Sequence, residues 1–387
     1  MIIKRLKEDH TFLFIILLTV AMAIGFQGWR TLINNFAVDN VGIGGFWIGI
    51  MQSVREIPGF LSMLVIFLTI ILSEYKIISL SAIVLGIGVA MTGFWPTHTG
   101  LIITTLIMSV GFHYFETTRQ SLVLQNFDKA DTPSILGGLN SLSAATNIIV
   151  GIAILIAASY LSMKIMFFII GVIVIILAGF SLKCKAQNNA SHMQHKKMIF
   201  KRKYWLFYVL NFLAGARRQI FVVFAVFLLV KHYKFSVELI TILFIINNVV
   251  NIYAAPFIGK RIKINGERKV LVLGYILLLL IFISYAVFDN PWIASGLYIL
   301  DNILFNINIG VRTYFQKNAD KADIAPSMAV GFTINHICAI FFPFLGGILW
   351  MYDYTIPFYM GAGIAVLSIV FACMIKEYKP NIPSSNK

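Results

Sequence analysis

Six arginines lie inside segments of the chain that are otherwise apolar, and they are the residues best suited to binding a ligand. An arginine at the centre of a bilayer costs about 2.5–3.5 kcal/mol on an insertion scale, so six of them facing lipid would cost roughly 15–20 kcal/mol. Each must therefore line water, pair with an acid or reach the membrane surface. The six are Arg30, Arg55, Arg119, Arg217, Arg218 and Arg312.

The acids that could neutralise these arginines are too few. Only Glu56, Glu116 and Asp301 lie clearly within the same segments. Pairing therefore leaves an excess of positive charge in the interior of the protein. Guanidinium groups offer planar, bidentate donors to carboxylate or phosphate. We therefore predict a cavity that binds an anion.

Depth along the predicted helices separates the arginines into two groups. At a rise of about 1.5 Å per residue, Arg218 lies about 20 Å into its segment and Arg55 about 13 Å from the end of its own. Arg119 and Arg312 lie within about 10 Å of an end, where reaching the surface explains them more simply. Arg30 is shallower, but it begins a short sequence, R-x5-F-A-V, that occurs again at Arg218. Arg30, Arg55 and Arg218 are therefore the predicted binding arginines.

Asparagines add uncharged hydrogen-bonding groups suited to a polyhydroxylated or amide-bearing solute. Asn247, Asn302 and Asn306 are the predicted binding residues among them. Asparagines can equally hold membrane helices together, and for any single one this alternative stays open. Further asparagines in the same two segments are Asn248, Asn251 and Asn308.

One predicted helix carries residues that could move a proton. His113, Glu116 and Gln120 share a helix face because their spacing is i, i+3, i+7, and Arg119 follows Glu116 by three residues. Glu116 could exchange a proton as the cavity opens and closes. A static Glu116–Arg119 pair that closes one end of the cavity is the alternative. The full set predicted for proton coupling or gating is His113, Glu116, Arg119, Glu56, Asp301 and Arg312.

Composition indicates that these helices lie in a membrane. Hydrophobic residues make up 59% of the 387 residues and charged residues 12%, and the mean hydropathy is +0.85. These values are typical of a polytopic, all-α membrane protein. The three cysteines have no spacing that indicates a disulfide framework, a metal site or a redox site, and we predict no metal and no cofactor.

Twelve segments are long and apolar enough to cross the hydrocarbon core, which needs about 20 residues of helix. An even number of spans places both termini on the same side of the membrane. The predicted spans are 12–37, 46–72, 77–95, 100–124, 134–160, 164–182, 204–230, 237–258, 270–288, 293–315, 326–350 and 356–375.

The distribution of lysine and arginine predicts which side that is. With a cytoplasmic N-terminus, cytoplasmic segments hold 22 of the 31 basic residues, and the segments on the other side hold only Lys164, Lys231 and Lys234. This bias follows the positive-inside rule, so both termini are predicted to be cytoplasmic. The net charge of +15 is then mainly a consequence of topology and does not indicate nucleic-acid binding.

Two short sequences occur twice and indicate a duplication. R-x5-F-A-V begins at Arg30 and again at Arg218, and N-x-D-K-A-D begins at Asn126 and again at Asn318. The offsets of 188 and 192 residues are nearly equal, as expected for two homologous halves. The DKAD aspartates are explained by helix capping and by pairing with loop lysines more simply than by metal binding.

The duplication predicts three parts. Residues 1–182 form an N-terminal bundle of six helices, residues 183–203 a basic cytoplasmic linker, and residues 204–387 a C-terminal bundle of six helices. The linker is polar, basic and without apolar periodicity, as expected of a flexible connection between two bundles.

Twelve spans in two halves with a central basic loop resemble the major facilitator superfamily. Its signature, G-x3-D-R-x-G-R-R, is matched in part by residues 259–269, which keep both glycines and the basic tail. Lys263 and Ile264 stand where Asp-Arg is expected, and the copy at residues 73–77 is essentially absent. The resemblance implies a central cavity lined by spans 1, 4, 7 and 10, which would bring Arg30 and Arg218 together.

We therefore expect a secondary transporter that works by alternating access and moves a small organic or phosphorylated anion, with the proton as the candidate coupling ion. Proton-coupled efflux of drugs or other amphipathic compounds is the alternative, and a membrane-embedded, lipid-linked transferase is a third. The expected location is the inner or plasma membrane, with a small-molecule substrate and the lipid bilayer as partners. A monomer is expected to be functional.

Overall fold

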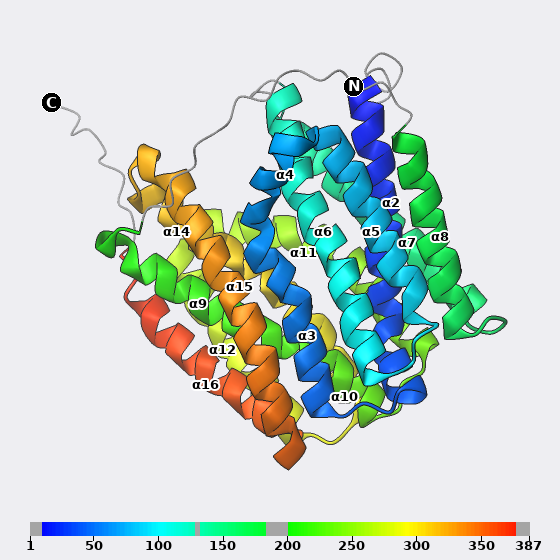
Figure 1. The fold of residues 1–387 in the computed structure, drawn as a ribbon. Coiled ribbons are helices and arrows are strands. Elements are labelled where there is room, and N and C mark those ends of the chain that lie inside the picture. Colours follow the sequence, from blue (N-terminus) through cyan, green and yellow to red (C-terminus); the bar gives the residue numbers. More distant parts are fainter. Residues whose placement is uncertain (1–9, 128–131, 183–199, 377–387) are drawn as a thin grey trace, which may run out of the picture.

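A computed structural model describes residues 10–127, 132–182 and 200–376. These residues form long helices joined by short loops, and the described part of the chain contains no strand (Figure 1). Hydrocarbon offers no hydrogen-bonding partner to the backbone, so an apolar chain satisfies its amide groups within helices. The linker predicted at 183–203 lies outside the described residues except for 200–203.

The helices of the first half follow the predicted spans in order. A π-helical turn, η1, continues the first helix, and a 3-10 turn, η2, divides the second predicted span into two helices. In order they are α2 (His10–Asn35), η1 (Phe36–Asn40), α3 (Gly45–Phe60), η2 (Leu61–Leu64), α4 (Val65–Ile71), α5 (Glu74–Thr92), α6 (His98–Asn126), α7 (Thr132–Ala157) and α8 (Met163–Ser181).

The second half follows in the same manner, with short 3-10 or π segments interrupting two of its spans. In order they are η3 (Arg202–Tyr204), α9 (Trp205–Ile220), η4 (Phe221–Ala225), α10 (Val226–Lys231), α11 (Val237–Asn265), α12 (Glu267–Val287), α13 (Pro291–Leu304), η5 (Phe305–Ile307), α14 (Asn308–Asn318), α15 (Lys321–Tyr352) and α16 (Ile356–Cys373).

Ten helical stretches among the described residues are long and apolar enough to cross a membrane. The predicted spans 46–72 and 100–124 are helical but are not among the ten. The first is divided at η2, three residues after Pro58, which lies inside α3. The second, in α6, carries His113, Glu116 and Arg119 on one helix. The count of twelve spans remains a prediction, as does the cytoplasmic position of the termini.

Both copies of the R-x5-F-A-V repeat include a π-helical turn. In the first copy the turn is η1, and in the second it is η4. Such turns insert one residue into a helix and are frequent at functional sites. The duplicated sequence is therefore accompanied by a duplicated irregularity, close to Arg30 in one half and to Arg218 in the other.

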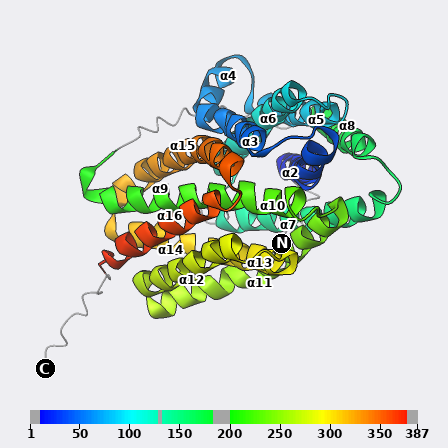
Figure 2. The same cartoon turned by 90° about the horizontal axis from the view of Figure 1, so that it is seen from below.

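The two halves of the chain, on either side of the predicted linker, make their most extensive contacts through two helix pairs. α3 packs along α15, and α7 packs along α11. Figures 1 and 2 show α3 and α15 side by side in both views. α2 begins on the upper side of the bundle in Figure 1, and α16 runs from the lower side toward that upper side. We call this upper side the terminal side.

The α3–α15 contact is tightest on the side opposite to the terminal side. A Cβ atom on Gly49 would lie 2.4 Å from the carbonyl oxygen of Pro343, and one on Gly45 would lie 2.3 Å from the ring of Trp350. The Ser53 hydroxyl donates to the carbonyl of Ile340 at 2.6 Å. Glycine therefore brings the two backbones together here, as small residues do between membrane helices.

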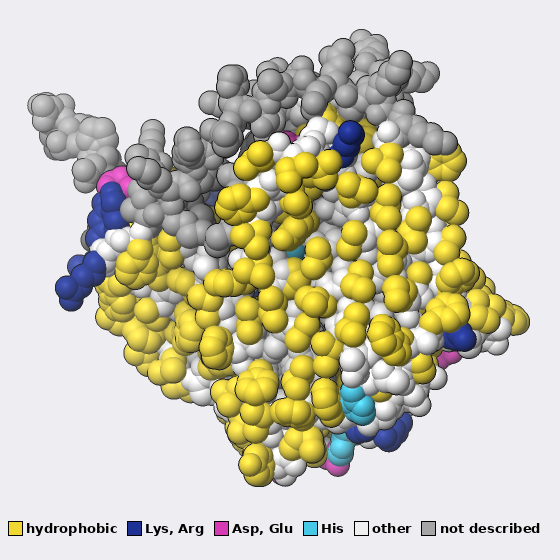
Figure 3. All heavy atoms as spheres, in the orientation of Figure 1, with side chains coloured by type: hydrophobic (Ala, Val, Ile, Leu, Met, Phe, Trp, Pro, Cys, Tyr) yellow, Lys and Arg dark blue, Asp and Glu magenta, His cyan; other side chains and the backbone are white. Residues whose placement is uncertain are grey.

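The outer surface of the bundle is apolar. Figure 3 shows hydrophobic side chains over most of the visible face, with charged residues near its edges. Large aliphatic side chains such as Ile71 and Ile156 are exposed. A contiguous apolar surface of this extent suits lipid contact. Polar groups that could bind a ligand or a proton must therefore be sought inside the bundle.

The close approach at Gly49 yields a test of the fold. We expect Gly49→Ala to reduce stability by about 1–3 kcal/mol, because a new methyl group would overpack against the α15 backbone. The midpoint of thermal unfolding, measured on purified protein in detergent, should fall. Gly296→Ala in α13 is the matched control, because nothing lies within 4 Å of its added Cβ. Equal midpoints for the two variants would contradict the tight α3–α15 contact.

Candidate functional site

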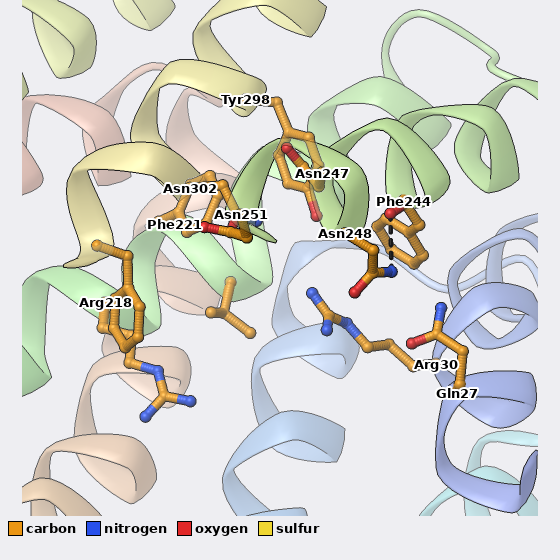
Figure 4. Close-up of a pocket in the computed structure, with 12 residues that line it drawn as sticks. Gln27, Arg30, Arg218, Phe221, Phe244, Asn247, Asn248, Asn251, Tyr298 and Asn302 are labelled. Atoms are coloured by element: carbon orange, nitrogen blue, oxygen red, sulfur yellow. Dashed lines mark hydrogen bonds between the residues drawn. The ribbon is translucent and has the colours of Figure 1, made fainter. Parts of the chain in front are cut away.

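A polar cavity of about 190 Å³ lies between α2, α9, α11 and α13. Figure 4 shows Arg30 on one side of it and Arg218 on the other, with asparagines and aromatic rings between them. The lining residues come from both halves of the chain. They are Gln27, Arg30, Arg218, Phe221, Val222, Phe244, Asn247, Asn248, Asn251, Tyr298, Asn302 and Phe305.

Arg30 and Arg218 hold their positive charges without an acid partner. Within the described residues neither forms a salt bridge, and each lies over an aromatic ring instead. The guanidinium carbon of Arg30 is 4.9 Å from the centre of the Phe244 ring, and that of Arg218 is 5.0 Å from the centre of the Phe305 ring. Cation–π contacts hold the charges in place but do not neutralise them.

Arg218 is exposed although it lies deep in the bundle. It lines this cavity and also a second one, so its exposed surface faces internal space. A guanidinium group at this depth is stable only where water or an anion replaces the solvent it has lost. The cavity therefore carries positive charge that no acid of the described residues balances.

The predicted asparagines play different parts. Asn251 donates to Asn302 at 2.8 Å, and Asn306 donates to Asn251 at 2.8 Å, so these three link α11 to α13 and η5. Asn247 is different, because it is buried and neither its amide oxygen nor its amide nitrogen has a hydrogen-bond partner. Buried polar atoms are normally satisfied, so the unpartnered amide of Asn247 stands out among the residues that line the cavity.

A second cavity of about 370 Å³ continues from Arg218 toward the terminal side. Gln120 of α6 and Arg312 of α14 line it and are exposed. It therefore leads from Arg218 toward the ends of α6 and α14. Its lining residues with ionisable side chains are Arg55, Glu56, His113, Glu116, Arg218, Arg312 and His336.

Arg55 lies in this second cavity and is paired with an acid. Its Nη2 is 2.7 Å and its Nε 3.2 Å from Oε1 of the adjacent Glu56. The other carboxylate oxygen of Glu56 lies 3.3 Å from Nδ1 of His336. The structure therefore separates Arg55, whose charge Glu56 balances, from the Arg30 and Arg218 pair.

Glu116 and Arg119 form an ion pair at 2.8 Å with the i, i+3 geometry of one helix. The Glu116 side chain is 32% exposed and that of Arg119 10%. This arrangement matches the static pair that sequence reasoning offered as one alternative. The proton-carrying role of Glu116 remains a prediction.

Asp301 and Arg217 lie away from both cavities. Asp301 is buried and its Oδ2 has no hydrogen-bond partner. Arg217 is also buried, and its guanidinium carbon is 5.0 Å from the centre of the Tyr275 ring. Arg217 points away from Arg218, as expected for adjacent residues of a helix, whose side chains differ in direction by about 100°.

Three aromatic or histidine side chains are among the contributors to these cavities that the sequence did not predict. Phe244 and Tyr298 line the first, and His336 lines the second. All three stand in apolar runs where an aromatic or histidine side chain is ordinary packing. Only the spacing of Phe244 to Asn247 and Asn251, three and then four residues apart on one helix face, could have singled out one of them.

The second DKAD copy pairs with lysines that precede α9. Both Asp323 oxygens accept from Lys201 at 2.7 Å, and Tyr204 donates to Asp323 at 2.7 Å. Lys203 pairs with Asp320. These hydrogen bonds hold the pKa of Asp323 below its usual range. The predicted pairing with loop lysines is thus observed here, whereas the first copy at 128–131 lies outside the described residues.

Long apolar helices that enclose an internal polar chamber define a multi-pass membrane protein. Over residues 13–343 the sequence matches the Major Facilitator Superfamily. The chain therefore belongs to the major facilitator superfamily, as its resemblance predicted. Among curated protein sequences, none matches this chain.

Solved structures with the same fold include transporters of different cargo. The nucleoside transporter NupG, as its D323A mutant, gives a TM-score of 0.79 at 18% identity and covers 95% of this chain and 100% of its own. A bacterial homologue of the human lysosomal transporter Spinster gives 0.75 at 11%, covering 95% and 98%. A bacterial homologue of the iron transporter ferroportin gives 0.75 at 11%, covering 94% and 98%. At these identities the likeness establishes the fold.

The two Glu–Arg pairs lead to a prediction about stability. We expect Glu56→Gln to cost about 3–5 kcal/mol, because it leaves Arg55 buried without a counter-charge. Glu116→Gln should cost less than about 1 kcal/mol, because that pair is partly exposed to water. Thermal unfolding of the two purified variants provides the comparison. A larger loss for Glu116→Gln would show that the Arg55–Glu56 pair is not the buried one.

Proposed function

We propose that this protein is a secondary transporter for a small organic or phosphorylated anion. The observation that carries the proposal is the pair formed by Arg30 and Arg218, two guanidinium groups that line one internal cavity without an acid partner in the described chain. A carboxylate or phosphate between them would supply the missing charge and accept bidentate hydrogen bonds. The free amide of Asn247 would orient the rest of the cargo.

Alternating access fits the arrangement of the two cavities. The α3–α15 contact closes the side opposite to the terminal side, while the second cavity extends from Arg218 toward the terminal side. With both termini cytoplasmic, as predicted, this is an inward-facing arrangement. We propose that the halves rock about the site between them, in the inner or plasma membrane, and that a monomer suffices.

A nucleoside is the second candidate cargo. The cavity places the rings of Phe221, Phe244, Tyr298 and Phe305 beside four asparagines. Aromatic rings can stack on a base, and amides can read its edge or the sugar hydroxyls. The structural likeness to a nucleoside transporter suggests the test. This candidate leaves the charges of the two arginines without a partner, which is why the anion is preferred.

Two further alternatives fit less well. Efflux of drugs or other amphipathic compounds accounts for the aromatic rings but leaves the unpaired arginines unexplained. A lipid-linked transferase would need acid–base groups gathered at one membrane face, whereas the three acids predicted within the spans are separate: Glu56 and Glu116 pair with arginines, and Asp301 is buried without a partner for Oδ2. Inhibition of transport by anions and not by organic cations would exclude the first, and absence of product with purified protein would exclude the second.

Uptake into vesicles tests the proposed cargo class. Protein reconstituted in liposomes should move a nucleoside monophosphate or a sugar phosphate in preference to the matching nucleoside or sugar, because only the phosphate engages both arginines. Arg218→Gln and Arg30→Gln should each reduce phosphate transport about tenfold or more, as loss of a charged hydrogen bond of 1.5–3 kcal/mol implies. Transport of the uncharged partner should change little.

The control is Arg261→Gln, since Arg261 lies over Phe257 on an exposed part of α11, away from both cavities. It should transport like the wild type. Unchanged phosphate transport in both cavity variants would overturn the anion assignment. Preference for the nucleoside over its monophosphate would favour the second candidate.

A further inference from the structure

The contact between Glu56 of α3 and His336 of α15 joins the two halves at the edge of the second cavity. Nδ1 of His336 lies 3.3 Å from Oε2 of Glu56, and both residues are buried. The contact has ion-pair distance but not the geometry of a hydrogen bond, so Nδ1 has no hydrogen-bond partner. A buried imidazole nitrogen aimed at a carboxylate and lining a cavity is placed to take up a proton.

The contact between Glu56 and His336 lies where the packed part of the α3–α15 pair ends. From the side opposite to the terminal side, α3 meets α15 at Gly45 and Trp350, then at Gly49 and Pro343. The hydrogen bond from Ser53 to Ile340 follows, and the contact of Glu56 with His336 comes next. Beyond it the helices border the second cavity. Glu56 and His336 therefore lie at the cavity end of the closed part.

Gly59 allows the imidazoles to sit against the α3 backbone. A Cβ atom at residue 59 would lie 2.4 Å from Cε1 of His336 and 2.6 Å from Cε1 of His113. The two imidazole rings are 5.3 Å apart, at 74° to one another. Any side chain at residue 59 would displace His336 from Glu56. Three helices, α3, α6 and α15, thus converge on one titratable group.

Several charged groups surround His336. Glu56 is in ion-pair contact with it, and Arg55 shares the Glu56 carboxylate from α3. His113 faces it from α6, and Arg218 interacts electrostatically with Glu56 from α9. Electrostatic attraction falls with distance, and the Glu56 carboxylate is the acid in contact with His336 while α3 and α15 are together. Glu116 of α6 and Arg312 of α14 line the same cavity.

We propose that His336 is the site that binds the coupling proton, and that its protonation fastens α3 to α15 in the arrangement seen here. This deepens the transporter function proposed above and rests on it. Protonated His336 forms an ion pair with Glu56, whereas separation of α3 from α15 removes the carboxylate and releases the proton. A ligand shifts a two-state equilibrium by its differential affinity for the two states. Each tenfold difference in proton affinity therefore changes the population ratio tenfold.

Spin-label distances test the proposal without any cargo. Labels are attached at Lys76→Cys on α5 and Lys260→Cys on α11, two exposed positions in different halves, after the three native cysteines are replaced by alanine. Lowering the pH from 8 to 5.5 should increase the population that is open on the terminal side severalfold. In His336→Gln this change should disappear, because glutamine keeps a hydrogen-bonding group but takes up no proton.

Control variants separate His336 from other titrating groups. His98→Gln, at the start of α6 and with its ring tilted against that of Trp47, should keep the full pH response. Glu56→Gln should move the response to lower pH. If His336→Gln fails to fold, His336→Asn, which also lacks a titratable group, should lose the response. An unchanged response in His336→Gln, or its loss in His113→Gln alone, would overturn the proposal.

The two proposals can fail separately. A pH response that depends on His336, in a protein that moves no anion in vesicles, would leave the proton site standing and reject the cargo. Anion transport that depends on Arg30 and Arg218, with a pH response unaffected by His336→Gln, would reject the proton site alone.

Discussion

Positive charge held in an apolar bundle is the constraint on which this structure depends. A guanidinium group cannot lose its proton to escape the membrane, so each buried arginine needs an acid, an aromatic ring or water. Arg55 and Arg119 have acids, and Arg217 has the Tyr275 ring. Arg30 and Arg218 have rings but no acid. The internal cavity exists where these two meet, because hydration or an anion must complete their environment.

The sequence predicted more of the architecture than of the site. Apolar runs and the repeat were sufficient to predict the helical membrane fold. The length of an apolar run and the recurrence of a short sequence can both be read directly along the chain. The repeat also linked Arg30 to Arg218, which the structure places at one cavity. The pairing of Arg55 with Glu56 was not foreseen, because adjacent residues on a helix do not normally face each other. His336 was missed because only the packing of α15 on α3 gives it a partner.

Asparagines show why residue type alone could not define the binding surface. Asn251, Asn302 and Asn306 satisfy one another across three elements, while Asn247 on the same helix as Asn251 keeps both amide atoms free. The two behaviours were the two alternatives that the sequence left open. Deciding between them requires knowing which partner lies opposite each amide, which is a property of helix packing and not of spacing along the chain.

The structure divides two tasks between the helices that line its interior. α2 and α9, which carry the duplicated arginines and π-helical turns, present unpaired charge to the first cavity. α3 and α15 approach through glycines and carry the titratable contact. Arg218 lines both cavities, so a charge that arrives beside it changes the field at Glu56 as well. An anion near Arg218 would lessen the attraction between Arg218 and Glu56, so under the two proposals cargo and proton would influence one another through this arginine without touching.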